Sequence, residues 1–289
     1  MLLRGQLTIA AGVAVLAWVG VGVVVASPRD VTHETAVAAS APAAAGATAF
    51  DPEALAPPTA REEFRDLRIV DGALERDVPE QGGLKLRYTL DPELSSAVWK
   101  SLERGRFALA HVVVMEPRTG ALLAYASTDP ERFPPDRTYP AASLVKVITA
   151  AATLDREPRA AREACRFVGS PWRLTRARLE APKSGKNVDM RKALATSNNQ
   201  CFARWAVKRV GSGALIDAID RFGMLTSPAP GHPEGEAQDP GEDALVLGEL
   251  GSGLDGLEIT PLHAAQLAAT LVEGQLVEPR WLAAVWDAT

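Results

Sequence analysis

The sequence has no long run of basic residues, and this absence sets the first limit on its function. Its 289 residues carry 31 Lys and Arg against 36 Asp and Glu, a formal net charge of −5. Proteins that bind nucleic acid normally present a concentrated basic patch or stripe. A nucleic-acid partner is therefore not expected.

Histidine is scarce, and its spacing excludes the familiar metal centres. The four histidines are His33, His111, His232 and His263, and no two stand at the separation of metal ligands. The chain also lacks the Gly-x-Ser-x-Gly elbow of α/β-hydrolases, since Gly251-Ser252-Gly253 does not have that spacing. Neither a metal, a cofactor nor a Ser-His-Asp triad of that type is expected.

Cysteine is limited to Cys165 and Cys201, which allow a single pairing. A disulfide is permitted if this part of the chain is outside the cytoplasm. The alternative is two buried free thiols. Neither cysteine has the surroundings of a catalytic nucleophile.

The N-terminal residues 1–26 carry the one long hydrophobic run. Arg4 precedes residues 7–26, which contain no charge and are numerous enough to span a bilayer as a helix. Val24-x-Ala26 also resembles a signal-peptidase site. We expect an uncleaved transmembrane anchor with the bulk of the chain outside, and a cleaved signal is the alternative.

Residues 27–60 form a second, distinct segment of the sequence. Seventeen of its 34 residues are Ala or Pro, and it shows no apolar periodicity. Such a segment cannot bury enough surface to fold alone, which predicts a disordered tether. The folded domain is expected to occupy residues 61–289. Hydrophobic residues make up 47% of the whole chain, which allows a sizeable core.

The first candidate for chemistry lies in residues 139–154. Every residue from Leu144 to Leu154 is aliphatic or Ala except Lys146 and two threonines, which predicts a buried helix. Ser143 and Lys146 stand three residues apart, so their side chains share one face of this helix. Burial lowers the pKa of a Lys amine toward the range in which it can accept a proton from a hydroxyl. The alternative is an ordinary core helix with a capping Ser and a Lys that reaches solvent.

Several regular elements are predicted before this helix. Residues 84–89 alternate with period two, and the Asp-Pro pair at 91–92 supplies a helix N-cap and a first-turn proline. Residues 110–115 and 121–126 flank a five-residue turn that ends in Gly, which predicts a β-hairpin. Both strands are more apolar than alternation requires, so we expect helices on both faces of the sheet.

Two later motifs complete a recognisable order. Ser197-x-Asn199 lies between a short helical pattern and an apolar one, and Thr260-Pro261-Leu262 opens a further helix after a glycine-rich turn at 250–253. Together with Ser143-x-x-Lys146 and the hairpin, these motifs resemble the transpeptidase domain of penicillin-binding proteins, the serine acyltransferases that cross-link peptidoglycan. The resemblance covers roughly residues 84–289.

The resemblance implies an α/β (α+β) fold of the β-lactamase and transpeptidase type, with an antiparallel sheet flanked by helices and an all-helical subdomain. It implies that Ser143 is acylated by D-Ala-D-Ala stem peptides or β-lactams, with Lys146 as base. Ser197 would relay a proton toward the leaving group with Lys146, and Asn199 would hydrogen-bond the substrate amide and orient the Lys. The alternative for Ser197 and Asn199 is that they only cap helices.

The third motif of the family, Lys-Ser/Thr-Gly on a β-strand, does not follow the Thr-Pro-Leu helix in this sequence. In the family that strand binds the substrate carboxylate and supplies an oxyanion-hole N–H, so its loss is expected to be costly. Lys183-Ser184-Gly185 has the same letters but precedes Ser197 among polar turn formers, and we interpret it as a loop. We expect an uncovered edge beside the hairpin, left by a truncated copy or completed by another chain.

Deacylation is expected to be slow. Class A β-lactamases of the family carry a Glu in a Glu-x-x-Leu-Asn stretch, and none of the three asparagines here follows a Leu. We therefore expect a serine D,D-transpeptidase at the bacterial cytoplasmic membrane, facing the periplasm or exterior, with stem peptides, β-lactams and other cell-wall synthesis proteins as partners. The alternative is an inactive or truncated envelope protein that keeps part of the fold for binding or scaffolding. The balance of transpeptidation against carboxypeptidation stays open.

Overall fold

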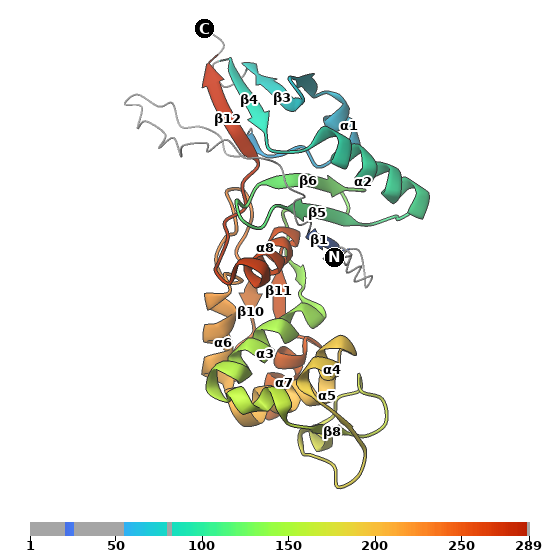
Figure 1. Cartoon of the computed structure of the whole chain (residues 1–289), viewed down its shortest axis with the longest axis vertical. Coiled ribbons are helices and arrows are strands. Elements are labelled where there is room, and N and C mark those ends of the chain that lie inside the picture. The colour runs from blue at the N-terminus through green and yellow to red at the C-terminus, as the bar shows by residue number, and fades with distance from the viewer. Residues whose placement is uncertain (1–20, 26–54, 80–82, 288–289) are drawn as a thin grey trace, which may run out of the picture. The chain divides into compact units, whose positions relative to one another are not determined.

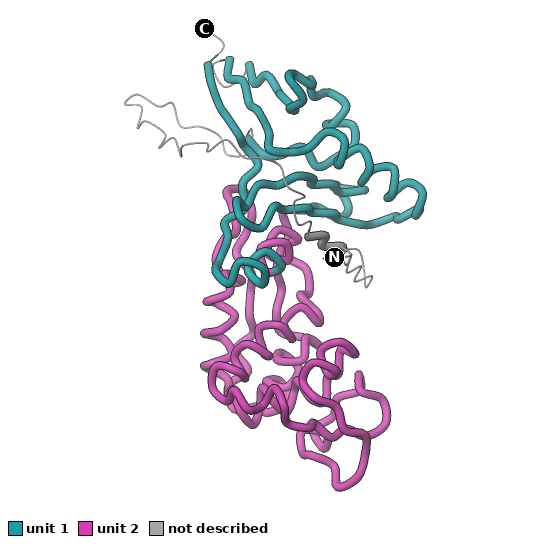
Figure 2. The backbone as a smooth tube through the Cα atoms, in the orientation of Figure 1, with its two compact units in different colours: residues 1–135, 268–289 teal, residues 136–267 magenta. Residues whose placement is uncertain are grey.

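The computed structural model describes residues 21–25, 55–79 and 83–287 (Figure 1). The chain divides into two compact units, one made of the residues before 136 and after 267 and the other of Asp136–Leu267 (Figure 2). Ser143, Lys146, Ser197 and Asn199 all belong to the second unit. One unit therefore holds all four predicted site residues.

The first unit contains a four-stranded antiparallel sheet. Its strands stand in the order β12 (Leu282–Asp287), β4 (Leu84–Tyr88), β3 (Ala73–Val78) and β2 (Arg68–Val70), and the short helix α1 (Arg61–Arg65) precedes them. The period-two prediction for β4 is confirmed, because Leu84, Leu86 and Tyr88 are buried. The strand that closes this sheet comes from the far end of the chain.

The predicted hairpin is also confirmed. It consists of β5 (His111–Met115) and β6 (Leu122–Ser127), paired antiparallel. Helix α2 (Pro92–Gly105) begins at the expected N-cap, where the Asp91 side chain accepts a hydrogen bond of 2.7 Å from the Leu94 N–H. Trp99 and Leu102 of this helix pack against the hairpin.

The prediction of a helix over residues 21–25 is not supported by the structure. This segment is strand β1 (Val21–Val25), which pairs in parallel with β5 at one edge of the hairpin. Four of its five residues are Val, and β-branched residues favour strands. Residues 1–20 and 26–54 lie outside the described residues. The predicted tether extended to residue 60, and this end of it is wrong: the Thr59 carbonyl accepts a hydrogen bond from the Ser127 N–H over 2.8 Å, and the Leu55 carbonyl accepts one from the Trp281 indole over 2.7 Å. Within the described ranges, no helix has the length and apolar character to cross a membrane.

The second unit is mainly helical. Its helices are α3 (Val145–Arg156), α4 (Met190–Ala195), α5 (Asn199–Trp205), α6 (Ser212–Arg221), α7 (Ala244–Ser252) and the start of α8 (Pro261–Glu273). Two small sheets accompany them: β8 (Cys165–Phe167) with β9 (Lys186–Val188), and β10 (Glu236–Ala237) with β11 (Leu257–Ile259) and β7 (Tyr139–Pro140). Figure 1 shows α3 among the other helices of this unit.

Helix α3 is the buried helix that the sequence predicts. Val145 and Ile148 are fully buried, and Lys146 is only 1% exposed. The Thr260-Pro261 helix start is confirmed as well, with the Thr260 hydroxyl accepting a hydrogen bond from the His263 N–H. Local sequence rules therefore locate both helices of the motif set.

Candidate active site

Ser143 lies on a 3-10 turn, Ala142–Leu144, that runs directly into α3. Ala142 before it has φ +48°, a left-handed conformation that turns the chain sharply. The Ser143 hydroxyl is thereby held at the N-terminal end of a 12-residue helix. Unpaired backbone N–H groups and the helix dipole favour developing negative charge at such a position.

Lys146 is hydrogen-bonded to Ser143, as their spacing predicts. Its Nζ donates to the Ser143 Oγ over 2.8 Å and to the Ser252 carbonyl over 2.5 Å. Burial lowers the pKa of Lys146 to about 8, since desolvation disfavours the charged amine. At pH 7 about a tenth of such an amine is neutral and able to accept a proton.

The end of α7 supplies the second partner of Lys146. One turn further along α3, the Thr149 Oγ1 donates to the Gly251 carbonyl over 2.8 Å. Two α3 side chains thus bind the last two carbonyls of α7, which have no partner within their own helix. The glycine-rich stretch at 250–253 thus holds the Lys146 amine.

Gly253 allows the end of α7 to lie close to the start of α3. It ends α7 with φ +67°, and a Cβ at this position would lie 1.8 Å from the Ala142 carbonyl oxygen. Only glycine allows the α7 terminus to lie against the turn that carries Ser143. A Gly in this position, in front of a Thr-Pro-Leu helix, was the available signal.

Ser197 also reaches the nucleophile. Its Oγ lies 2.8 Å from the Ser143 Oγ, and its backbone at φ +49° forms the turn between α4 and α5. The three side chains therefore form a hydrogen-bonded chain from Ser197 through Ser143 to Lys146. A proton can be exchanged along this chain.

Asn199 is placed beside this group but is bonded elsewhere. Its Nδ2 donates to the Trp172 carbonyl over 2.8 Å, and within the described part of the chain it makes no hydrogen bond to Lys146. The Ser252 carbonyl therefore orients the Lys here, in the role predicted for Asn199. The capping alternative applies to the neighbouring Asn198, whose Oδ1 accepts from the Cys201 N–H at the start of α5.

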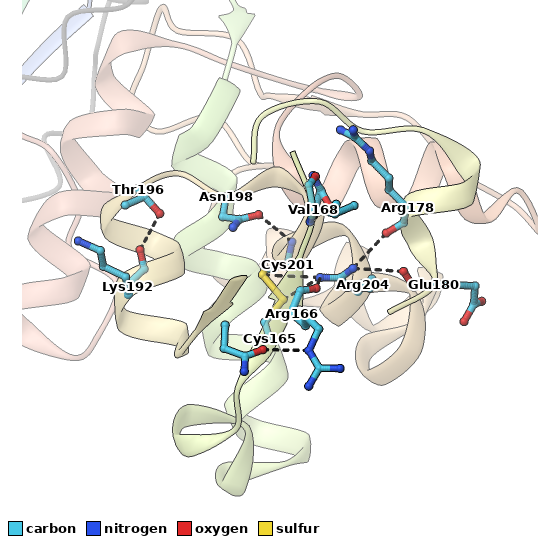
Figure 3. Close-up of a disulfide and its surroundings, with 12 residues drawn as sticks. Cys165, Arg166, Val168, Arg178, Glu180, Lys192, Thr196, Asn198, Cys201 and Arg204 are labelled. Carbon is cyan, nitrogen blue, oxygen red and sulfur yellow. Dashed lines mark hydrogen bonds between the residues drawn. A yellow bond between two sulfur atoms is a disulfide. The ribbon is translucent and has the colours of Figure 1, made fainter. Parts of the chain in front are cut away.

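A disulfide between Cys165 and Cys201 joins β8 to α5 (Figure 3). Of the two alternatives for the cysteines, the disulfide is the one that the structure contains. The Arg204 guanidinium donates to the Cys165 Sγ over 2.9 Å and to the carbonyls of Arg166, Arg178 and Glu180. These contacts fix the segment after β8 against α5, close to the Ser197 turn.

Lys183-Ser184-Gly185 is a turn outside the Ser143 group, as interpreted from the sequence. It connects to β9, so the expectation that Lys186 and Asn187 are turn residues is wrong. The reason is the close pairing of β9 with β8: a Cβ on Gly185 would lie 2.2 Å from the Phe167 carbonyl oxygen. Pairing with a neighbouring strand overrides the low strand propensity of these residues.

The three described histidines have structural partners. His111, His232 and His263 are buried, and the ring of each lies within hydrogen-bond distance of a backbone carbonyl. His33 lies outside the described residues. None of the three belongs to the group around Ser143.

The sequence is similar to known proteins over most of its length. A family model, the penicillin binding protein transpeptidase domain, matches residues 110–288. The chain is 30% identical over 243 residues to the peptidoglycan D,D-transpeptidase PbpA of Mycolicibacterium smegmatis, covering 71% of this chain and 48% of that protein. It is 28% identical over 246 residues to PbpA of Mycobacterium tuberculosis, with coverages of 72% and 49%. The chain thus spans about half the length of the curated relatives it matches.

Solved structures show the same fold. Penicillin-binding protein A from M. tuberculosis superposes with a TM-score of 0.60 at 24% identity, over 71% of this chain and 56% of that one. Its ceftriaxone acyl-enzyme complex gives a TM-score of 0.59 at 24% identity, over 71% and 55%. The family model covers more than half of this chain, and its range includes Ser143–Lys146, Ser197–Asn199 and the Thr260–Leu262 helix start. The chain therefore belongs to the penicillin-binding protein transpeptidase domain family.

Proposed function

We propose that this chain is a serine D,D-transpeptidase of peptidoglycan cross-linking. One observation carries the proposal: the Ser143 hydroxyl is hydrogen-bonded both to the buried amine of Lys146 and to the hydroxyl of Ser197. This arrangement activates a serine without a histidine. The names of the curated relatives, peptidoglycan D,D-transpeptidases, support the same reaction.

The first half of the reaction forms an acyl-enzyme. Neutral Lys146 takes the proton of Ser143, and the Oγ attacks the carbonyl carbon between the two D-Ala residues of a stem peptide. The C–N bond breaks, and the terminal D-Ala leaves as an amine that receives its proton through Ser197. A β-lactam ring opens by the same attack and leaves the same kind of ester.

The second half transfers the acyl group. The amine of a neighbouring stem peptide attacks the ester carbonyl, gives up a proton to the Lys146 and Ser197 chain, and forms the new amide. The ester bond to the Ser143 Oγ breaks, the Oγ takes back a proton from this chain, and the free enzyme is restored. Asn199 would hydrogen-bond the amide of the donor peptide through the second N–H of its Nδ2 or through its Oδ1, while the first N–H keeps the Trp172 carbonyl.

We place the domain on the outer side of the bacterial cytoplasmic membrane. The uncharged residues 7–20, ahead of strand β1, support an anchor or signal, and residues 27–54 would act as a tether. The disulfide supports an oxidising compartment. Other cell-wall synthesis proteins would be encountered there.

Labelling with a fluorescent penicillin tests the proposal. The wild-type chain is expected to form a covalent adduct that survives denaturing electrophoresis, and Ser143→Ala is expected to abolish it. Ser184→Ala is the matched control, since Ser184 lies exposed in the other Lys-Ser-Gly stretch. A folded wild-type protein without an adduct would instead favour the scaffolding alternative. Mass spectrometry with an added D-amino acid separates transfer to an amine from transfer to water.

A further inference from the structure

Charge is unevenly divided along the second unit. Residues 159–209 contain thirteen Lys and Arg against three Asp and Glu, whereas residues 210–258 contain one against ten. The small net charge of the whole chain hides this division. Ser197 and Asn199 lie inside the basic segment.

Part of the basic segment is used within the fold. Arg204 is buried, Arg176 pairs with Asp243, Lys208 pairs with Glu180, and Arg209 pairs with Glu157 and Glu163. Eight of the remaining side chains are exposed and form no ion pair with a carboxylate of the described residues, and six of them lie between the start of β8 and the end of α4. We call these six the basic surface: Arg166, Arg173, Lys183, Lys186, Arg191 and Lys192.

The basic surface is held in place by the β8–β9 hairpin and the α5 contacts. The Arg166 guanidinium donates to the Lys183 carbonyl over 3.0 Å, and Phe167 pairs with Lys186 across the two strands. The disulfide and Arg204 fasten this hairpin to α5, as Figure 3 shows around Arg166. Exposed like charges on a fixed framework repel one another, so they do not serve stability.

Trp172 connects this surface to the candidate active site. Its indole is 63% exposed, although its Nε1 donates to the Thr196 carbonyl over 3.2 Å, directly before Ser197. The backbone carbonyl of the same residue accepts the hydrogen bond from Asn199. Exposed Trp and Arg are the residues most enriched at binding hot spots.

We propose that the basic surface and Trp172 bind the acceptor strand of peptidoglycan through the carboxylates of its stem peptides. The inference rests on the proposed function, because the acceptor amine must arrive beside Ser197 for the second half of the reaction. Arg and Lys pair with carboxylates, and the indole packs on apolar parts of the strand. Each exposed contact is weak, but a strand with repeated peptides engages several at once.

Binding to purified insoluble peptidoglycan sacculi, measured by co-sedimentation, tests this proposal. Lys183→Glu/Lys186→Glu is expected to weaken binding about tenfold, and Trp172→Ala about fivefold. The matched control is Arg156→Glu/Arg221→Glu, which makes the same change of net charge at two exposed positions outside the surface and is expected to bind like wild type. Raising the salt concentration is expected to weaken wild-type binding toward that of the double variant, since salt screens exposed charges.

Three outcomes would overturn the inference. They are equal binding by the two double variants, binding by wild type that does not respond to salt, and stronger competition by inorganic polyphosphate or phosphatidylglycerol vesicles than by poly-glutamate. Circular dichroism confirms folding of each variant, and the salt response of wild type stands even if one variant does not fold. Penicillin labelling of the wild type separates the two proposals. Salt-dependent binding without an adduct would overturn the proposed function, and with it the acceptor role, and would leave only a peptidoglycan-binding surface. An adduct without salt-dependent binding would overturn the acceptor surface alone.

Discussion

Lys146 and Arg204 are buried cations of the same unit, yet the two regions around them do different work. Both side chains bind backbone carbonyls, and neither forms a salt bridge with a carboxylate of the described residues. Burial lowers the pKa of both groups. The Lys amine comes down to about 8, where it can exchange a proton, whereas the guanidinium starts so high that it stays charged.

The two side chains also differ in the number and kind of their hydrogen-bond partners. Arg204 distributes its planar fork over three carbonyls and a disulfide sulfur, so it fastens separate segments together. Lys146 has one carbonyl partner and one hydroxyl partner, and the hydroxyl is that of the proposed nucleophile. Burial without a carboxylate therefore brings the pKa of the Lys into the range of a base, as proposed for Lys146, whereas the Arg stays charged and joins separate segments.

Lys146→Arg breaks the comparison most severely, because it puts a permanently charged group at the reactive position. The variant keeps a positive charge and hydrogen-bond donors but cannot take the proton of Ser143. Acylation by a fluorescent penicillin is expected to slow by about 10³-fold, within the usual range for loss of a general base. The measurement is the rate of adduct formation over time.

The pH dependence of the same rate supplies the control. Only the neutral amine is a base, so wild-type acylation is expected to rise as the pH increases through about 8 and to level off above it. The residual rate of Lys146→Arg is expected to lack this rise. A wild-type rate that stays flat between pH 6 and pH 9, or a variant that retains the rise, would contradict the assignment of Lys146 as base.

Arg204→Met tests the other half of the comparison. It leaves the carbonyls of Arg166, Arg178 and Glu180 without their buried donor, and the free energy of unfolding is expected to fall by about 3 kcal/mol. Urea unfolding with the disulfide intact measures it.

Lys146→Met is the matched control for stability. It leaves one carbonyl, that of Ser252, without its donor, but it also removes a buried amine whose charge is disfavoured by desolvation, so the unfolding free energy is expected to change by less than about 1 kcal/mol. If both Met variants lost similar stability, the distinction between a reactive cation and a clamp would be wrong.

Local patterns were enough to predict one of these regions. The Ser143–Lys146 contact follows from helical spacing, and the low Lys pKa follows from the apolar residues around it. The approach of Ser197 depends on contacts across 54 residues, and only the resemblance to a family predicted it. The Lys-holding role of Ser252 lies 106 residues away and was assigned to Asn199.

The region around Arg204 was largely beyond prediction. Two cysteines are compatible with a disulfide or with free thiols until their backbones are placed, and β8 is too short for a periodic signal. Strand β1 was missed for a similar reason, because a run of valines is compatible with both a membrane helix and a strand. In each case long-range pairing decides, and spacing along the sequence does not record it.

Thr149→Val gives the smallest expected effect and examines how firmly Lys146 is held. The change keeps the shape of the side chain but removes its hydrogen bond to the Gly251 carbonyl, one of the two ties between α3 and the end of α7. Loss of one buried hydrogen bond is worth about 1–2 kcal/mol, so acylation is expected to slow by roughly tenfold if that tie positions the Ser252 carbonyl for Lys146. Thr153→Val is the control, since the Thr153 hydroxyl is equally buried but bonds the Thr149 carbonyl of its own helix. The control is expected to change the labelling rate less than about twofold, because that bond joins no second helix. Equal labelling rates for the two variants would mean that the Thr149 hydrogen bond does not help to position the Ser252 carbonyl for Lys146.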